Sequence, residues 1–299
     1  MAIHSSRANA MRQTADALAA ALPALMAQAE QIANTLVYGV HGRRRAGTGE
    51  SFWQFRHYIA GDSARKIDWR QSGKSQHHYV RENEWQGAQS LWLWCDRSAS
   101  MSYRSEMARH SKQERAFVIL LALASLLLRG GERVGLLGAA GTAPQSSRMA
   151  FAGFVEAFIL SREAPADLPP LQALPRFSRL VLAGDFLSPL EETAARLNAY
   201  ASRGVKGHIV QILDPAEEDL PFEGRVRFEG TQGEGSLIIG RAQDLRGPYR
   251  QLMQGHQAGL RELCRSLDWG YTLHRTDRPA QWALLSLYQG LSEKLLGAR

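Results

Sequence analysis

Three side chains that can bind a hard cation lie at alternate positions directly after an apolar run. Residues 90–95 read SLWLWC, and Asp96, Ser98 and Ser100 follow them. A loop with side chains at alternate positions can direct one carboxylate and two hydroxyls at a single point. Oxygen ligands of this kind suit Mg²⁺, which prefers octahedral oxygen coordination and retains several waters. The pattern is compatible with a divalent-metal site, and also with an aspartate that caps the following helix.

A second carboxylate, Asp185, follows another apolar run, SRLVLAG at 178–184. Ligands of open α/β sheets bind at the carboxyl ends of the strands, so Asp96 and Asp185 are expected to share one edge. Asp185 could then add to the metal site through water, although it could also be a turn or cap residue. A metal held mainly by neutral hydroxyls stays Lewis acidic. A carboxylate of a partner protein could complete its coordination, which would make the ion a bridge.

The elements that must position these residues alternate between strands and helices. The expected strands are 90–95, 133–139, 178–184, 207–213 and 270–276, and the expected helices are 112–129, 149–161, 189–203, 248–267 and one from Pro279. Alternation of this kind with continuously apolar strands predicts an α/β fold with a doubly wound, mostly parallel sheet.

The chain divides into three parts that differ in amino-acid composition and hydrophobic pattern. Residues 1–37 carry one apolar helical stripe and are expected to form a helical arm that docks on the rest of the molecule or on a partner. Residues 38–88 are rich in Gly, Arg and aromatics and predict a small β-rich subdomain. Residues 89–299 form the α/β domain, with an insertion at 214–246.

The composition is that of a globular protein with a basic surface. The 299 residues are 44% hydrophobic and 22% charged, with a net charge of +7. Only two cysteines occur, Cys95 and Cys264, and both are expected to be buried free thiols in a reducing cytoplasm. The longest apolar run, 116–128, falls short of the roughly 18 residues that a membrane span needs.

Enzymatic motifs are missing from the sequence. Ser98 lacks the GxSxG context of a hydrolase nucleophile, GTGES lacks the following Lys and Ser or Thr of a P-loop, and no HExxH or CxxC spacing occurs. Arg43, Arg44 and Arg45 form a basic patch near aromatics, but no recognised nucleic-acid motif accompanies them. A solvated basic loop is the favoured interpretation, and nucleic acid is a disfavoured partner.

A dense charged and aromatic cluster, Asp62, Arg65, Asp68 and Trp69, lies in the β-rich part. It could be a docking surface for a partner. It could also be an internal ion-pair and packing cluster, and this structural interpretation is favoured because an arginine between carboxylates satisfies its own hydrogen bonds.

Two stretches resemble known families. DRSASM after a buried strand, followed by ERVGLL and LVLAGDF, resembles the von Willebrand factor type A fold with its metal-ion-dependent adhesion site. One continuous block begins with GRRRAGTG, contains GD, R and IDW in that order, and ends with VRENEW. This block and the tail YTLHRTDRP resemble the bacterial domain of unknown function 58 family. The resemblance covers nearly the whole chain from about Pro23.

This resemblance implies a non-enzymatic protein that works with a MoxR-type AAA+ ATPase on an unknown client protein. By position it implies Asp96, Ser98, Ser100 and Asp185 as ligands of Mg²⁺ or another divalent cation. The family's fifth ligand is a threonine, for which Thr142 is the candidate, with Ser146 and Ser147 as substitutes. Two alternatives remain: a metal-free module for an acidic or nucleic-acid partner, and a metal-dependent hydrolase.

Overall fold

The computed structural model describes residues 27, 31–33, 52–57, 72–73, 79–83, 90–138, 144–146, 166–175, 178–231 and 235–296. The chain divides into two compact units, of which one comprises residues 1–39 and 89–299 and the other residues 40–88. In the smaller unit, β1 (Phe52–His57) pairs antiparallel with β2 (Tyr79–Asn83), with a register irregularity between Phe52 and Gln54.

A five-stranded sheet forms the centre of the larger unit. Its spatial order is β4-β3-β5-β6-β9, and every neighbouring pair is parallel. The strands are β3 (Ser90–Cys95), β4 (Arg133–Leu136), β5 (Arg179–Gly184), β6 (Lys206–Leu213) and β9 (Gly270–Arg275). The predicted mostly parallel α/β sheet is therefore confirmed. β4 is shorter than expected, because it ends at Leu136 instead of residue 139.

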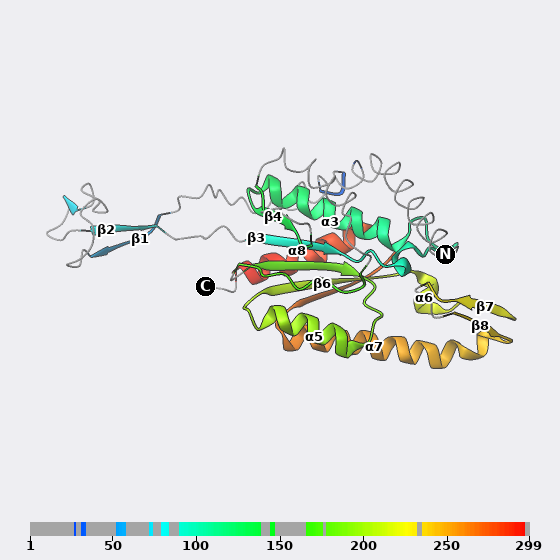
Figure 1. Cartoon of the computed structure of the whole chain (residues 1–299). Coiled ribbons are helices and arrows are strands. Elements are labelled where there is room, and N and C mark those ends of the chain that lie inside the picture. The colour runs from blue at the N-terminus through cyan, green and yellow to red at the C-terminus, as the bar shows by residue number, and fades with distance from the viewer. Residues whose placement is uncertain are drawn as a thin grey trace, which may run out of the picture. The chain divides into compact units, whose positions relative to one another are not determined.

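Helices cover both faces of this sheet (Figure 1). α3 (Lys112–Arg129) and α8 (Ala280–Leu296) lie on one face, and α5 (Leu190–Ala201) and α7 (Arg246–Ser266) lie on the other. The remaining elements are short: η2 (Ala99–Ser102), α6 (Pro215–Asp219), the β7 (Val226–Glu229) and β8 (Ser236–Ile239) hairpin, and η3 (Ala242–Leu245).

The strands divide their side chains between two hydrophobic clusters because successive residues of a strand point to opposite faces. Leu91 and Leu93 of β3 join the cluster that contains α3 and α8, whereas Trp92 and Trp94 join the cluster on the other face. Ile32 of the N-terminal region is buried in the α3 and α8 cluster. Both faces of the sheet are thus buried, which explains the continuously apolar strands.

Local signals fix the ends of α3 where the sequence predicts them. Ser111 accepts a hydrogen bond from the Glu114 backbone N–H, and the Glu114 carboxylate accepts one from the Ser111 N–H. This capping box satisfies two of the free donors at the helix start. The helix stops before Gly130 and Gly131, and Gly131 has a φ of 80°, a conformation that glycine adopts at little cost. The first residue of α3 is thereby placed at a defined point beside the sheet edge.

Candidate functional site

The two aspartates that end apolar strands lie on neighbouring strands. β3 pairs with β5, with Cys95 opposite Ala183, so Asp96 and Asp185 leave the sheet at the same edge. The Asp96 backbone N–H donates to the Ala183 carbonyl at 2.8 Å. Both aspartates are buried, with 0% and 3% of their surface exposed.

A chain of hydrogen bonds joins the aspartates to the two serines. The Ser98 backbone N–H donates to Asp96 Oδ1 at 2.7 Å, and the Ser98 and Ser100 hydroxyl oxygens lie 2.9 Å apart. The Ser100 hydroxyl donates to Asp185 Oδ2 at 2.6 Å. The structure therefore brings together all four residues of the DxSxS and Asp185 pattern. Ser100 is only partly buried, so the cluster reaches solvent on this side.

Gly184 lets the two strand ends approach this closely. A Cβ at this position would lie 2.8 Å from Asp96 Cβ and 3.1 Å from Asp96 Oδ2. These separations are shorter than a normal van der Waals contact, so a side chain at residue 184 would push against the Asp96 carboxylate. The glycine that precedes Asp185 is thus a requirement of the cluster.

Neither aspartate is the N-cap of a helix. The N-cap of η2 is Ser98, and the N-cap of α5 is Pro189. Each carboxylate does bind one nearby backbone N–H, since Asp96 Oδ1 accepts from Ser98 and Asp185 Oδ1 accepts from Leu187 at 3.3 Å. One oxygen of each aspartate therefore stabilises its own loop, and the other oxygen is left for the cluster.

Asp96 Oδ2 is a buried carboxylate oxygen that has no hydrogen-bond partner among the described residues. Burial, together with the nearby charge of Asp185, raises the pKa of Asp96 to about 7. A buried carboxylate oxygen without a donor is costly, and either protonation, which the raised pKa favours, or a bound cation compensates it. This orphaned oxygen, beside two hydroxyls and a second carboxylate, fits a hard divalent cation.

Lys112 supplies a positive charge that sequence reasoning missed. This first residue of α3 is fully buried, and its Nζ lies 2.8 Å from Asp185 Oδ2 and 2.5 Å from Glu217 Oε1. Burial alone would lower the pKa of Lys112, but the two carboxylates more than offset it and the pKa is raised. The lysine therefore stays protonated. The first turn of α3 reads KQER, a polar start that does not mark Lys112 as buried.

The end of β6 and the short helix α6 that follows it contribute two more carboxylates. Asp214 follows β6 and is the N-cap of α6, forming a capping box with Glu217. Asp214 Oδ2 accepts from the Ser105 backbone N–H at 3.0 Å, so this aspartate ties the η2 side of the site to α6. Glu217 Oε2 accepts from the Asp214 N–H, which leaves Oε1 for Lys112. The sequence DPAE after an apolar strand is a capping-box signal that could have indicated Glu217.

The kinds of ligand in this cluster restrict which metal could bind. Among the described residues, no group of three or more His, Cys, Asp or Glu side chains is arranged to hold a metal ion. The available donors are instead the carboxylates of Asp96 and Asp185 and the hydroxyls of Ser98 and Ser100. Such a set favours Mg²⁺ over metals that prefer imidazole or thiolate.

Several residues singled out in the sequence lie outside the described residues: Thr142, Ser147, Arg43, Arg44, Arg45, Asp62, Arg65, Asp68 and Trp69. Ser146 is described and is exposed, next to Gln145, which bridges Val134 in an antiparallel sense. Val134 lies opposite Leu91, towards the start of β3, so Ser146 is far along the strand from Asp96. The register places Ser146 away from the strand end at Asp96, and its role as a substitute fifth ligand stays a prediction. Cys95 and Cys264 are buried free thiols, as predicted.

The family model of DUF58, described as a protein of unknown function, matches residues 54–259. The chain belongs to the DUF58 family. Two relatives are an uncharacterized protein, Rv1480, of Mycobacterium tuberculosis and an uncharacterized protein, Mb1516, of Mycobacterium bovis. Each is 27% identical over 275 residues, which cover 87% of this chain and 86% of the relative. The DUF58 match spans Asp96, Lys112, Asp185 and Glu217.

Two solved structures resemble the DUF58 chain at low similarity. One is an aerotolerance-related membrane protein from Bacteroides fragilis, with multiple mutations to serines, at 18% identity and a TM-score of 0.41 over 69% of this chain and 99% of that one. The other is the conserved hypothetical protein BatB from Bacteroides thetaiotaomicron, at 17% identity and a TM-score of 0.35 over 69% and 98%. Within the described part of the DUF58 chain, no helix has both the length and the apolar character of a membrane span.

Proposed function

We propose that this protein is a non-enzymatic adaptor that binds a partner protein through a divalent cation, Mg²⁺ in the first instance, held by Asp96, Ser98, Ser100 and Asp185. When bound, the ion would offer a Lewis-acidic position to a carboxylate of the partner. The observation that carries the proposal is the buried Asp96 Oδ2, which has no hydrogen-bond partner among the described residues and lies beside two hydroxyls and a second carboxylate.

The residues of the chain have separate tasks in this proposal. Asp96 and the two serines, on one loop, bind the ion directly. Asp185 orients Ser100 by accepting a hydrogen bond from its hydroxyl and adds negative charge from the next strand. Lys112, itself paired with Glu217, donates to the same Asp185 oxygen as Ser100, which keeps that carboxylate in place. This division resembles the metal-ion-dependent adhesion site of von Willebrand factor type A domains.

Catalysis is left out of the proposal because the carboxylates of the cluster, Asp96 and Asp185, are assigned to the cation, and neither Lys112 nor His256 is suited to act as a base. A lysine close to a serine can act as a general base when its pKa is depressed. Lys112 has the opposite shift, because Asp185 and Glu217 raise its pKa despite its burial. His256, from α7, uses Nε2 in a 2.6 Å hydrogen bond with the Phe186 carbonyl, so this nitrogen is a donor. Proton abstraction from Ser98 or Ser100 is therefore disfavoured.

The proposed partner is a MoxR-type AAA+ ATPase that acts with this protein on a client protein in the cytoplasm. This proposal rests on the resemblance of the GRRRAGTG to VRENEW block to the domain of unknown function 58 family. A complex of this kind would use the energy of the ATPase, so the adaptor itself would need only to bind.

Calorimetric titration of the purified chain with Mg²⁺, and with Mn²⁺ as a second probe, tests the site. Saturable binding is expected for the wild type and at least about tenfold weaker binding for Asp96→Ala and Ser98→Ala. Asp268→Ala is the matched control, since Asp268 is exposed and pairs with Lys206. Identical titrations for wild type and Asp96→Ala, with both folded by circular dichroism, would overturn the metal site.

A metal-free partner surface is the second candidate, and Lys112 favours it. Its ammonium group already compensates Asp185 and Glu217, so part of the negative charge at this edge needs no added ion. Capture of the ATPase by the immobilised chain, with and without EDTA, separates the two. Loss of capture in EDTA supports the bridging ion, and unchanged capture supports the metal-free surface.

A further inference from the structure

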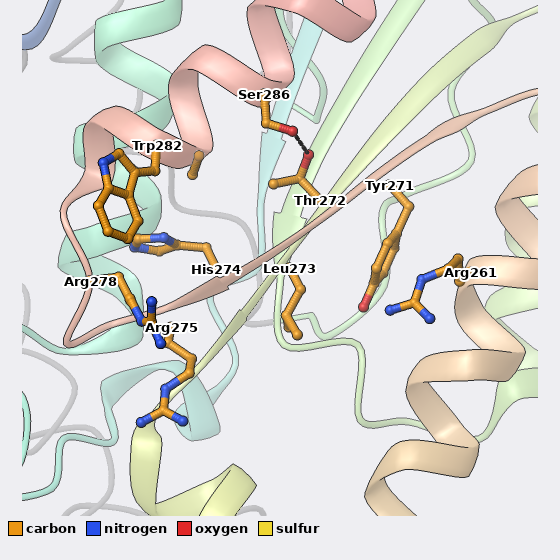
Figure 2. A pocket seen from close by; sticks show the side chains of 10 residues that line it. Arg261, Tyr271, Thr272, Leu273, His274, Arg275, Arg278, Trp282 and Ser286 are labelled. Atoms are coloured by element: carbon orange, nitrogen blue, oxygen red, sulfur yellow. Dashed lines mark hydrogen bonds between the residues drawn. The ribbon is translucent and has the colours of Figure 1, made fainter.

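β9 forms one edge of the five-stranded sheet. It pairs with β6 on one side, and no other strand of the described part of the chain pairs with its far side. An edge strand presents unpaired backbone N–H and C=O groups, which can pair with an added strand. Figure 2 shows this edge between α8 on one side and α7 on the other.

A groove runs along this edge. One hollow of about 470 Å³ is lined by side chains of β9, α7 and α8, and a second of about 360 Å³ shares Arg261 and Tyr271 with it. Side chains alternate between the two sides of the strand. Thr272 hydrogen-bonds to Ser286 of α8 at 3.1 Å, whereas Tyr271 lies under Arg261 of α7. The lining therefore follows β9, since residues 271 to 275 of the strand all contribute to the larger hollow.

Two arginines line the groove without a carboxylate partner in the described part of the chain. The Arg261 guanidinium carbon lies 5.3 Å from the Tyr271 ring centroid, and that of Arg278 lies 5.9 Å from the Trp282 centroid. These contacts with the rings hold each guanidinium in place while its N–H groups stay available.

Arg275 in the same groove provides a contrast. It forms ion pairs with Glu218 at 3.3 Å, with Asp219 at 3.1 Å and with Asp277 at 3.1 Å. Arg265, which lines the second hollow, likewise pairs with Glu262 at 2.9 Å. The groove therefore contains two arginines neutralised from within the chain and two that are left to bind something else.

The exposed Trp282 adds an apolar contact point. Its side chain is 59% exposed at the rim of the groove, beside Arg278. A tryptophan next to an arginine at the edge of a hollow is the kind of residue that contributes most to protein–protein binding. His274 lies between them and the strand, and burial lowers its pKa to about 3, so it adds no positive charge near neutral pH.

We propose that this groove binds an extended acidic segment of a partner protein, which adds to β9 as a further strand and places carboxylates on Arg261 and Arg278. Backbone groups of β9 would supply hydrogen bonds along the segment, and the arginines would supply selectivity for acidic residues. This surface is separate from the Asp96 cluster and does not depend on a metal.

Charge and backbone chemistry favour an acidic peptide over other occupants. A second copy of this chain is disfavoured because each copy carries a net charge of +7. Nucleic acid would satisfy the arginines through its phosphates, but it has no peptide backbone to pair with β9. An extended acidic peptide uses both features.

The test uses the full chain in EDTA and a fluorescein-labelled octapeptide of alternating glutamate and valine. Saturable anisotropy is expected, with binding weakened about tenfold by Arg261→Ala and by Arg278→Ala. Arg227→Ala is the matched control, since Arg227 is exposed on β7 and pairs with Glu229. It removes the same charge and should leave the affinity unchanged.

Two further probes make the result decisive. The same peptide N-methylated at alternate residues loses backbone donors and should bind at least tenfold more weakly. A lysine–valine octapeptide should not bind. The proposal fails if the acidic peptide does not saturate, if the N-methylated peptide binds equally well, if Arg227→Ala costs as much as Arg261→Ala, or if an oligothymidylate binds where the peptide does not. Because EDTA is present throughout, this result is independent of the metal titration.

Discussion

Lys112 Nζ lies 2.8 Å from Asp185 Oδ2, and both side chains are buried. The ammonium group also binds Glu217, so one cation links the end of β5 to the start of α6 across the first turn of α3. A buried ion pair contributes little net stability as a whole, but removal of one partner leaves an uncompensated charge. Lys112 therefore holds this edge of the sheet together, and its replacement alone would leave Asp185 and Glu217 buried without a cation.

Lys112→Met is expected to lower the free energy of unfolding by about 3–5 kcal/mol, because Asp185 and Glu217 then lie buried without their cation. Urea denaturation at neutral pH measures the effect. Lys206→Met is the control, since the Lys206 and Asp268 pair is exposed and its loss should cost about 1 kcal/mol or less. Adding Glu217→Gln to Lys112→Met should recover part of the loss. Equal effects of Lys112→Met and Lys206→Met would contradict the prediction.

Asp96→Asn should stabilise the metal-free protein at pH 8. Burial and Asp185 raise the pKa of Asp96 from 3.8 to about 7, so between these values the folded state binds more protons than the unfolded state. The contribution of Asp96 to stability therefore falls as the pH rises through this window. Asparagine keeps an oxygen for the Ser98 N–H without the charge.

The measurement is urea denaturation in EDTA at pH 8 and pH 5. We expect Asp96→Asn to exceed the wild type by on the order of 2 kcal/mol at pH 8 and by much less at pH 5. Asp268→Asn, at an exposed position, is the control and should show no such difference. A variant less stable than the wild type at pH 8 would mean that Asp96 stabilises the loop as a charged group.

Gly184→Ala is expected to cost about 1–3 kcal/mol, because the added Cβ would lie 2.8 Å from Asp96 Cβ. It should also weaken Mg²⁺ binding in the calorimetric titration if the cation site exists, since Asp96 must move. Gly255→Ala in α7 is a control of opposite sign: a Cβ there meets no atom within 4 Å, so alanine should stabilise the helix by about 0.5–1 kcal/mol. Neutral Gly184→Ala would show that the two strand ends can separate freely.

His274→Leu should make the chain more resistant to acid. Burial lowers the pKa of His274 from its ordinary value of 6.5 to about 3. Between pH 6.5 and pH 3 the imidazole is therefore protonated in the unfolded state and neutral in the folded state. Stability is therefore lost as the pH falls from 6.5 towards 3. His274 Nε2 has no partner among the described residues, so an apolar replacement forfeits no hydrogen bond from it.

Denaturation at pH 7 and pH 4.5 checks this. The variant should be close to the wild type at pH 7 and about 2 kcal/mol more stable than it at pH 4.5. A change in packing would alter the free energy of unfolding equally at both pH values, so the difference between the two pH values isolates the effect of protonation. A constant difference at both values would assign the effect to packing alone.

The sheet and its helices could be predicted because their signals are local. Apolar strands of four to eight residues and a capping box at Ser111 and Glu114 can be recognised in the sequence, and α3 begins and ends where the pattern predicts. The helix expected at 149–161 lies outside the described residues. The end of β4 was placed too late, because the apolar residues that follow Leu136 continue the pattern after the pairing with β3 stops.

The site could be predicted only in part because its charge balance depends on residues distant in sequence. Asp96 and Asp185 are visible as carboxylates at strand ends, and parallel pairing makes them neighbours. Lys112 and Glu217 are separated by 105 positions and meet only once α3 and α6 are placed. A lysine at a helix start is most often a solvated residue, so nothing in its local sequence separates it from one that is fully buried.

The packing of α8 on α3 has a consequence for synthesis of the protein. α3 ends at Arg129, and the residues of α8 that complete its hydrophobic cluster, such as Ala283 and Leu287, emerge from the ribosome only much later. Until then the nascent chain carries an apolar helix face without its final cover. Exposed apolar surface of this kind promotes aggregation, so aggregation during expression should depend on how fast the last helix is made.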